Sequence, residues 1–104
     1  RIVSFTSRSL IGIKTCNFAF HKQDAIAVNG FNEEFVGWGR EDSEFTVRLI
    51  NNGIRRRNMK FHGLAYHLYH PMNDRTRLHS NDEILNRTIA RKLTWCPKGL
   101  DQYL

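Results

Sequence analysis

The sequence predicts a single α+β domain with a few strands and about three helices. Segments rich in β-branched and aromatic residues predict strands, and three other segments carry the periodicity or the boundary signals of helices. The two kinds of segment follow no regular βαβ order, which indicates the α+β class. The 104 residues are enough for one domain with a modest core.

The first part of the chain is expected to contain a strand and a short helix. Residues 1–10 lack firm periodicity and should be irregular or form an edge segment. Residues 11–21 are β-prone, and four of their side chains are candidate core residues: Ile13, Cys16, Phe18 and Phe20. Residues 22–29 predict a helix that stops at Gly30, with three side chains turned inward: Ala25, Ile26 and Val28.

The middle of the chain carries the clearest helix signal. Phe45, Leu49 and Ile50 fall on one face of residues 41–52. Gly53 follows at the position of a C-terminal stop, so we expect a helix over this range.

The last part should hold a strand, a polar loop and a third helix. Apolar residues predict a strand over residues 54–69, interrupted at Gly63, and residues 71–77 form a polar loop. Residues 80–83, Ser-Asn-Asp-Glu, have the form of a capping box that opens a helix to about Leu93. The expected apolar side of this helix consists of Ile84, Leu85, Thr88, Ile89 and Leu93.

The composition is strongly basic, with a net charge of +6 and a pI near 9.8. This charge favours anionic partners such as nucleic acid, acidic glycans, nucleotide phosphates or a membrane surface, although a solvated basic face explains it equally well. No apolar run is long enough to span a bilayer, and no secretory signal is present. Cys16 and Cys96 match no zinc spacing and are expected to be free and buried. Because the sequence starts at Arg1 rather than Met, we expect an excised fragment or a processed product.

The most informative stretch is residues 28–48, in which Gly37-Trp38-Gly39 is followed by Glu41 and Asp42. Glycines on both sides give the tryptophan loop conformational freedom. An indole offers a flat apolar face that suits a sugar ring, and carboxylates accept hydrogen bonds from hydroxyls. Amides at the start of the following helix favour ionised acids, as a general base requires. The alternative is that the two acids only cap the helix.

Two histidines, His67 and His70, form a second candidate group. In a regular strand, residues three apart point to opposite faces. They can share a metal only if the chain turns there, which Pro71 favours. The other three histidines, His21, His62 and His79, have no partner spacing and are expected to be structural or exposed.

These motifs together resemble the C-terminal half of GT-A glycosyltransferases, of the β-1,4-galactosyltransferase-like and bacterial chondroitin-polymerase types. The resemblance covers roughly residues 13–74, and its most specific part is the Trp-Gly-x-Glu-Asp segment. It implies that residues 1–104 are one domain, the acceptor-side portion of a glycosyltransferase catalytic domain.

The resemblance also implies roles for individual residues. Asp42 matches the catalytic base that takes a proton from the acceptor hydroxyl, and Glu41 matches the acid that hydrogen-bonds the acceptor sugar. Trp38 matches the tryptophan of a mobile loop that closes over the donor, with Gly37 and Gly39 as hinges.

The implied cofactor is Mn²⁺ or another divalent cation. His70 matches the histidine that completes the metal site, and His67 falls where some members place a methionine ligand. The sequence departs from the family pattern in two ways. Arg40 replaces a small residue, and no Asp-x-Asp motif supplies an acidic metal ligand. The metal is therefore expected to bind only together with a missing donor-binding half, and the chain alone should be inactive.

The implied function is metal-dependent, inverting transfer of a hexose or N-acetylhexosamine from a UDP-sugar to a glycan acceptor hydroxyl, in polysaccharide biosynthesis. The expected partners are the nucleotide-sugar donor and the glycan acceptor, without nucleic acid, and the isolated fragment could form a homodimer. The expected location is the cytoplasm or the cytoplasmic face of the membrane, in a parent of bacterial type. Two alternatives are a non-catalytic carbohydrate-binding module and a basic binder of polyanions or nucleic acid.

Overall fold

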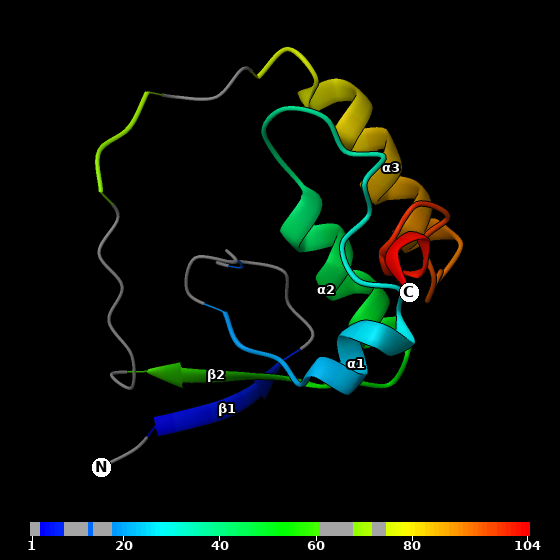
Figure 1. Ribbon diagram of the computed structural model, residues 1–104. Helices are drawn as coiled ribbons and strands as arrows, with labels where there is room; N and C mark the ends of the chain where they lie inside the picture. Colours follow the sequence, from blue (N-terminus) through cyan, green and yellow to red (C-terminus); the bar gives the residue numbers. More distant parts are fainter. Residues whose placement is uncertain (1–2, 8–12, 14–17, 61–67, 72–74) are drawn as a thin grey trace.

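The computed structural model describes residues 3–7, 13, 18–60, 68–71 and 75–104 (Figure 1). In chain order, the elements are β1 (Val3–Ser7), α1 (Lys22–Ala27), α2 (Glu41–Asn51), β2 (Arg56–Lys60), α3 (Leu78–Ala90) and the 3-10 helix η2 (Leu100–Tyr103). The described residues contain three α-helices and two strands. Helices α2 and α3 pack against each other, and the strands lie below them in the view of Figure 1.

Strands β1 and β2 form an antiparallel pair in which Val3 lies opposite Lys60 and Ser7 opposite Arg56. The segment expected to be irregular or at an edge, residues 1–10, thus supplies the strand β1.

The strand predicted over residues 54–69 is confirmed for residues 56–60 only. Residues 61–67 lie outside the described part of the chain, and residues 68–70 have no regular structure. Strands are stabilised by packing of side chains against their neighbours. Tyr69 is 95% exposed and lacks such packing. The apolar pattern alone is therefore not enough to form a strand at residues 68–70.

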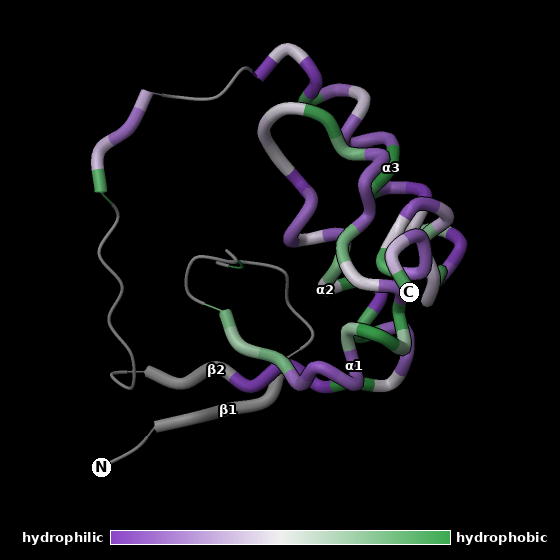
Figure 2. Tube along the Cα trace, in the orientation of Figure 1, coloured by the Kyte–Doolittle hydropathy of each residue, from purple (hydrophilic) through white to green (hydrophobic). Residues whose placement is uncertain are grey.

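The apolar core joins the end of α1 to the middle of α2. Val28, Phe45 and Leu49 are buried together, and three half-buried side chains pack against them: Phe18, Ala25 and Ile54. Figure 2 shows the hydrophobic stretch at the end of α1 lying close to α2. The predicted helix face is therefore confirmed for Phe45 and Leu49, whereas Ile50 is half-buried.

Three predicted core positions are exposed instead: Phe20, Ile26 and Ile89. Residues 18–20 do not form a strand, so the expected alternation of buried and exposed side chains does not apply to them. Ile13 and Cys96 are buried as predicted, and Cys96 is a free thiol. Cys16 lies outside the described residues.

The capping box predicted at residues 80–83 does not form. Helix α3 begins at Leu78, after the N-cap residue Arg77, so that Ser80 already lies within its first turn. Glu83 instead lies 3.2 Å from the ring of His79 on the same helix. The helix ends at Ala90, before the predicted Leu93. Among the described residues, no helix has the length and apolar character needed to cross a membrane.

A buried ion pair connects α2 to both of its helical neighbours. Arg48 donates to the carboxylate of Glu44 from Nε (2.9 Å to Oε2) and from Nη2 (2.9 Å to Oε1), and both side chains are fully buried. The Nη1 group of Arg48 donates to the carbonyl of Val28, which caps α1. The hydroxyl of Thr88 on α3 donates to Glu44 at 2.9 Å. The contacts of this pair with Val28 and Thr88 therefore tie α2 to the end of α1 and to α3.

Buried Asn29 connects the end of α1 to the C-terminal segment. Its Nδ2 donates to the carbonyl of Cys96 and to the carboxylate of Asp101, each at 2.8 Å. Its Oδ1 accepts from the backbone amide of Asp101 at 2.7 Å. A Cβ atom on Gly99 would lie 2.0 Å from the carbonyl oxygen of Asn29, so only glycine permits this close approach.

Removing the guanidinium of Arg48 should leave the carboxylate of Glu44 buried without its charge partner. We expect Arg48→Met to lower the free energy of unfolding by about 3–5 kcal/mol. The matched control, Arg87→Met, breaks the exposed pair with Glu34 and should cost about 1 kcal/mol or less. Urea unfolding followed by circular dichroism measures both variants. Equal losses would contradict a central role for Arg48.

A methyl group at position 99 should displace the C-terminal segment from Asn29. In a Cys16→Ser background, we expect Gly99→Ala to speed the labelling of the Cys96 thiol about tenfold. This corresponds to a decrease of about 1.4 kcal/mol in the free energy of the local opening that exposes Cys96. Gly53→Ala is the control, because Gly53 has a φ of 90° but open space around its Cα. Unchanged labelling of Gly99→Ala would show that the segment does not depend on this contact.

Candidate functional site

The loop before α2 has three residues in the left-handed backbone region: Gly37 (φ 73°), Gly39 (φ 110°) and Arg40 (φ 75°). Glycine adopts this conformation without the steric cost of a Cβ atom. For Arg40 the same conformation costs about 1–2 kcal/mol. Both expected hinge glycines thus occupy positions that other residues rarely fill.

Helix α3 holds this loop through Asn81. The buried amide of Asn81 donates to the carbonyl oxygens of Val36 (3.0 Å), Trp38 (3.3 Å) and Gly39 (3.1 Å). An amide has only two N–H groups, so the three carbonyls share them. Three carbonyls on one donor group fix the path of the loop from 36 to 39.

A second contact from α3 holds the residue that follows. The Nε of Arg40 donates to Asp82 at 2.6 Å in an exposed ion pair. This contact offsets part of the backbone cost at Arg40. The loop is therefore bound to α3 by both its backbone and a side chain.

The indole of Trp38 is 38% exposed beside this loop. The guanidinium of Arg75 lies 4.0 Å from the centre of its ring, in a cation–π contact. One side of the indole is thus covered by a cation, and the rest of its exposed surface is available to a ligand.

Glu41 and Asp42 are the first two residues of α2 and are half-buried. The Oδ1 atom of Asp42 accepts from the amide of Ser43 at 2.9 Å, and the Asp42 carbonyl accepts from the hydroxyl of Thr46. The residue in the N-cap position, Arg40, makes no side-chain capping bond. The two acids therefore lie directly behind the tryptophan loop, where the helix dipole favours negative charge.

The structure does not bring His70 next to this acid pair. His70 lies in the exposed segment 68–71, which Figure 1 places apart from the helices, and its Nδ1 is 2.8 Å from the carbonyl of Pro71. His67 lies outside the described residues. Within the described ranges, no three His, Cys, Asp or Glu side chains are grouped so that they could hold a metal ion. The described donor set therefore does not amount to a metal site.

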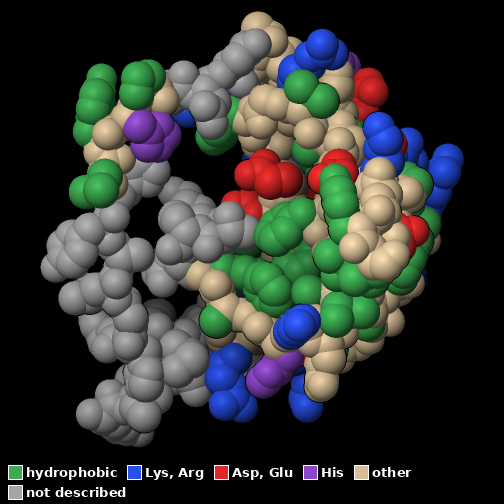
Figure 3. Space-filling model, in the orientation of Figure 1, with side chains coloured by type: hydrophobic (Ala, Val, Ile, Leu, Met, Phe, Trp, Pro, Cys, Tyr) green, Lys and Arg blue, Asp and Glu red, His purple; other side chains and the backbone are tan. Residues whose placement is uncertain are grey.

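Figure 3 shows acidic side chains bordering an apolar patch on the face that it presents. The exposed aromatic residues near Phe45 are Phe20 and Phe31, whose ring centres lie 5.1 and 4.4 Å from that of Phe45. Phe45 is one turn after Glu41 on α2, so acids and aromatic rings share a helix face.

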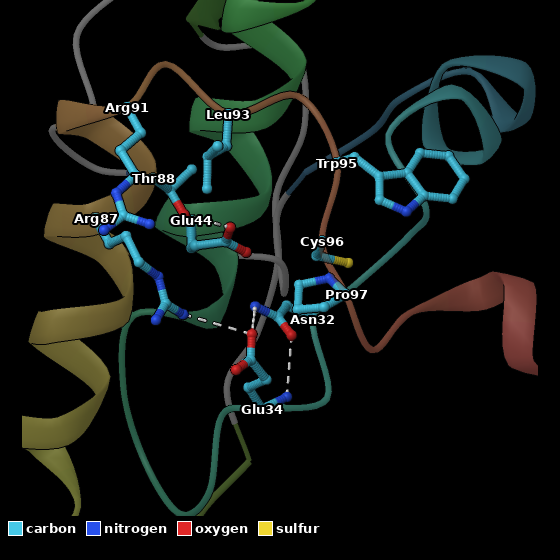
Figure 4. Close-up of a pocket in the computed structure, with 10 residues that line it drawn as sticks. All are labelled: Asn32, Glu34, Glu44, Arg87, Thr88, Arg91, Leu93, Trp95, Cys96 and Pro97. Atoms are coloured by element: carbon cyan, nitrogen blue, oxygen red, sulfur yellow. Dashed lines mark hydrogen bonds and ion pairs between the residues drawn. The ribbon is translucent and has the colours of Figure 1, made fainter.

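A separate pocket of about 260 Å³ lies between α3, the segment around Trp95 and the loop at Asn32 (Figure 4). Its lining contains none of Trp38, Glu41 and Asp42. The side chains of Glu44 and Cys96 reach it, and burial raises the pKa of the Cys96 thiol, while the charge of Arg48 acts in the opposite direction. A protonated thiol is a poor nucleophile. We therefore place the candidate site at the tryptophan loop and the acid pair rather than in this pocket.

Sequence reasoning missed the residues that support the site. Glu44 and Arg48 carry a readable signal, because acids and bases four residues apart pair on a helix. The sequence predicts Asn81 to be part of a capping box. The residues around it do not indicate that it binds a loop more than 40 positions away.

Comparison with known sequences finds two matches. Residues 4–71 match the model of a family described as the N-terminal domain of galactosyltransferase. A chondroitin synthase of Escherichia coli is 41% identical over 51 residues, which are 49% of this chain and 7% of that protein. The aligned part is thus a small portion of this relative. No solved structure matches the chain. The family match contains the tryptophan loop and α2, and it ends before α3.

Without the amide of Asn81, the loop at Trp38 should detach from α3. In a Trp95→Phe background, we expect Asn81→Ala to increase the quenching of Trp38 fluorescence by acrylamide. The variant should also lower the free energy of unfolding by about 1–3 kcal/mol, because buried carbonyls lose their donor. Asn86→Ala is the control, since Asn86 is exposed on the same helix. If both variants quench like the parent, Asn81 does not hold the loop.

Proposed function

The chain belongs to the galactosyltransferase family whose model covers residues 4–71, and from this premise we propose that it is part of a metal-dependent, inverting glycosyltransferase. The enzyme transfers a hexose or N-acetylhexosamine from a UDP-sugar to a hydroxyl of a glycan acceptor. The chain contributes the catalytic base and the acceptor site in an acceptor-side part of a GT-A fold.

The observation that carries this proposal is the position of Glu41 and Asp42, which open α2 directly behind the loop of Trp38. The carboxylate of Asp42 takes the proton of the acceptor hydroxyl as its oxygen attacks the anomeric carbon of the donor sugar. The bond from that carbon to the diphosphate breaks, the diphosphate leaves with the electron pair, and the configuration inverts. Glu41 accepts a hydrogen bond from the acceptor and orients it.

The loop of residues 36–40 supplies the cover of the donor. The indole of Trp38 closes over the bound sugar and excludes water, which would otherwise compete with the acceptor hydroxyl. Gly37 and Gly39 permit the backbone conformations that this closure needs.

The proposed cofactor is Mn²⁺, which His70 and His67 would hold together with acidic ligands from another part of the enzyme. The ion, when bound, neutralises charge on the diphosphate. The E. coli relative supports a longer parent protein, since the match spans 7% of its length. A homodimer of the isolated chain, formed by pairing at a sheet edge, belongs to the same proposal.

Replacing the base tests the proposal directly. In the full-length protein that carries this chain, we expect Asp42→Asn to lower kcat for transfer from UDP-galactose or UDP-N-acetylgalactosamine by about 10²–10⁴-fold. Asp24→Asn is the matched control, because Asp24 lies in the first turn of another helix, α1. The measurement is the incorporation of labelled sugar into glycan acceptors with Mn²⁺ present. Full activity of Asp42→Asn would show that this residue is not the base.

A further inference from the structure

Phe31 is exposed between two buried asparagines, which reverses the usual distribution of apolar and polar side chains. Phe31 is 39% exposed, whereas Asn29 is 1% and Asn32 is 5% exposed. Buried polar groups and exposed large apolar groups are the informative exceptions in a folded protein. The side chains of Asn29 and Asn32 both make hydrogen bonds inside the protein, while the ring between them reaches the surface.

The ring of Phe31 presents a flat face to solvent. It stacks on Phe45 with a centre-to-centre distance of 4.4 Å and an interplanar angle of 28°. Phe45 is completely buried, so one face of Phe31 is packed and its exposed surface belongs to the opposite face and the edges. Phe20, 44% exposed, stands edge-on to Phe45 at 70° beside it. We call Phe20 and Phe31 the aromatic platform.

The platform lies close to the acid pair. Phe45, on which both rings rest, follows Glu41 by four residues on the same face of α2. One helical turn rises about 5.4 Å, a spacing comparable to the size of a pyranose ring. A ligand held by Glu41 and Asp42 can therefore reach the platform with its next sugar unit.

The local backbone makes this platform rigid. Asn29 (φ 70°) and Gly30 (φ 66°) form a tight turn, and Asn29 is tied to Cys96 and Asp101. After Phe31, the Oδ1 of Asn32 accepts from the amide of Glu34 at 3.0 Å. A ring that is already fixed loses little conformational entropy when a ligand binds.

We propose that the aromatic platform binds the acceptor sugar next to the one whose hydroxyl reacts, so that the enzyme prefers an oligosaccharide over a monosaccharide acceptor. The apolar face of a pyranose stacks on Phe31, while its hydroxyls remain in water. Another protein is a less favourable occupant, because a water-free contact with it would remove water from the carboxylates of Glu41 and Asp42, which is costly. This inference rests on the proposed function and adds a specificity-determining residue to it.

The test compares acceptor length in three proteins. KM and kcat are measured for the full-length protein with N-acetylgalactosamine, unsulfated chondroitin disaccharide and unsulfated chondroitin tetrasaccharide. The variants are Phe31→Leu, which keeps an apolar contact with Phe45, and Phe35→Leu, which makes the same change in the same loop. We expect KM of the parent to fall about tenfold from the monosaccharide to the tetrasaccharide, equivalent to about 1.4 kcal/mol. Phe31→Leu should lose this gain at unchanged kcat, and Phe35→Leu should keep it.

The outcomes separate this inference from the proposed function. If transfer occurs but the parent and Phe31→Leu respond equally to acceptor length, the platform is not an acceptor subsite, although the function stands. If no UDP-sugar supports transfer, the proposed function is wrong. Titration of the 104-residue chain with the tetrasaccharide, followed by NMR, then tests whether the aromatic platform binds a glycan. Saturable binding that Phe31→Leu weakens would support the aromatic platform as a glycan-binding surface. Absence of binding would overturn this inference. A dimer that Phe31→Leu dissociates would identify the platform as a contact between copies and would also overturn it.

Discussion

The buried pair of Glu44 and Arg48 is the constraint on which the arrangement of the helices depends. A charged pair removed from water is tolerated only when all of its hydrogen-bonding groups find partners. Here those partners come from the end of α1, through Val28, and from α3, through Thr88. The three helices therefore cannot separate without leaving charge or polar groups unsatisfied. An apolar core of Val28, Phe45 and Leu49 alone would specify their angles and rotations less strictly.

This constraint also positions the candidate site. Glu41 and Asp42 lie three and two residues before Glu44 on α2, so the same helix that holds the buried pair presents the two acids. Helix α3, which Thr88 attaches to α2, carries Asn81 and Asp82 against the tryptophan loop. Structural polar groups and candidate catalytic groups thus share one helix. The loop before α2 carries Gly37 and Gly39 in the left-handed backbone region.

Local patterns in the sequence predict the parts that depend on local physics. The range of α2 follows from the spacing of Phe45 and Leu49 and from the stop at Gly53, with an error of one residue at its end. The two glycines around Trp38 predict unusual backbone angles. The capping box fails because α3 begins at Leu78, two residues before Ser80, so Ser80 is not at the N-cap position. The roles of Asn29 and Asn81 depend on partners far along the chain, and no spacing rule contains that information. The roles assigned to Asp42, His67 and His70 remain predictions.

The attachment of the tryptophan loop to α3 has a consequence for recombination between related sequences. A chimera that transplants only the stretch shared with galactosyltransferases, residues 4–71, carries the loop and the two acids but leaves behind Asn81, Asp82 and Thr88. The graft would arrive with unpaired carbonyls on the loop and an incomplete shell around Glu44. A workable breakpoint must therefore lie beyond Asp101, where the last partner of Asn29 is found.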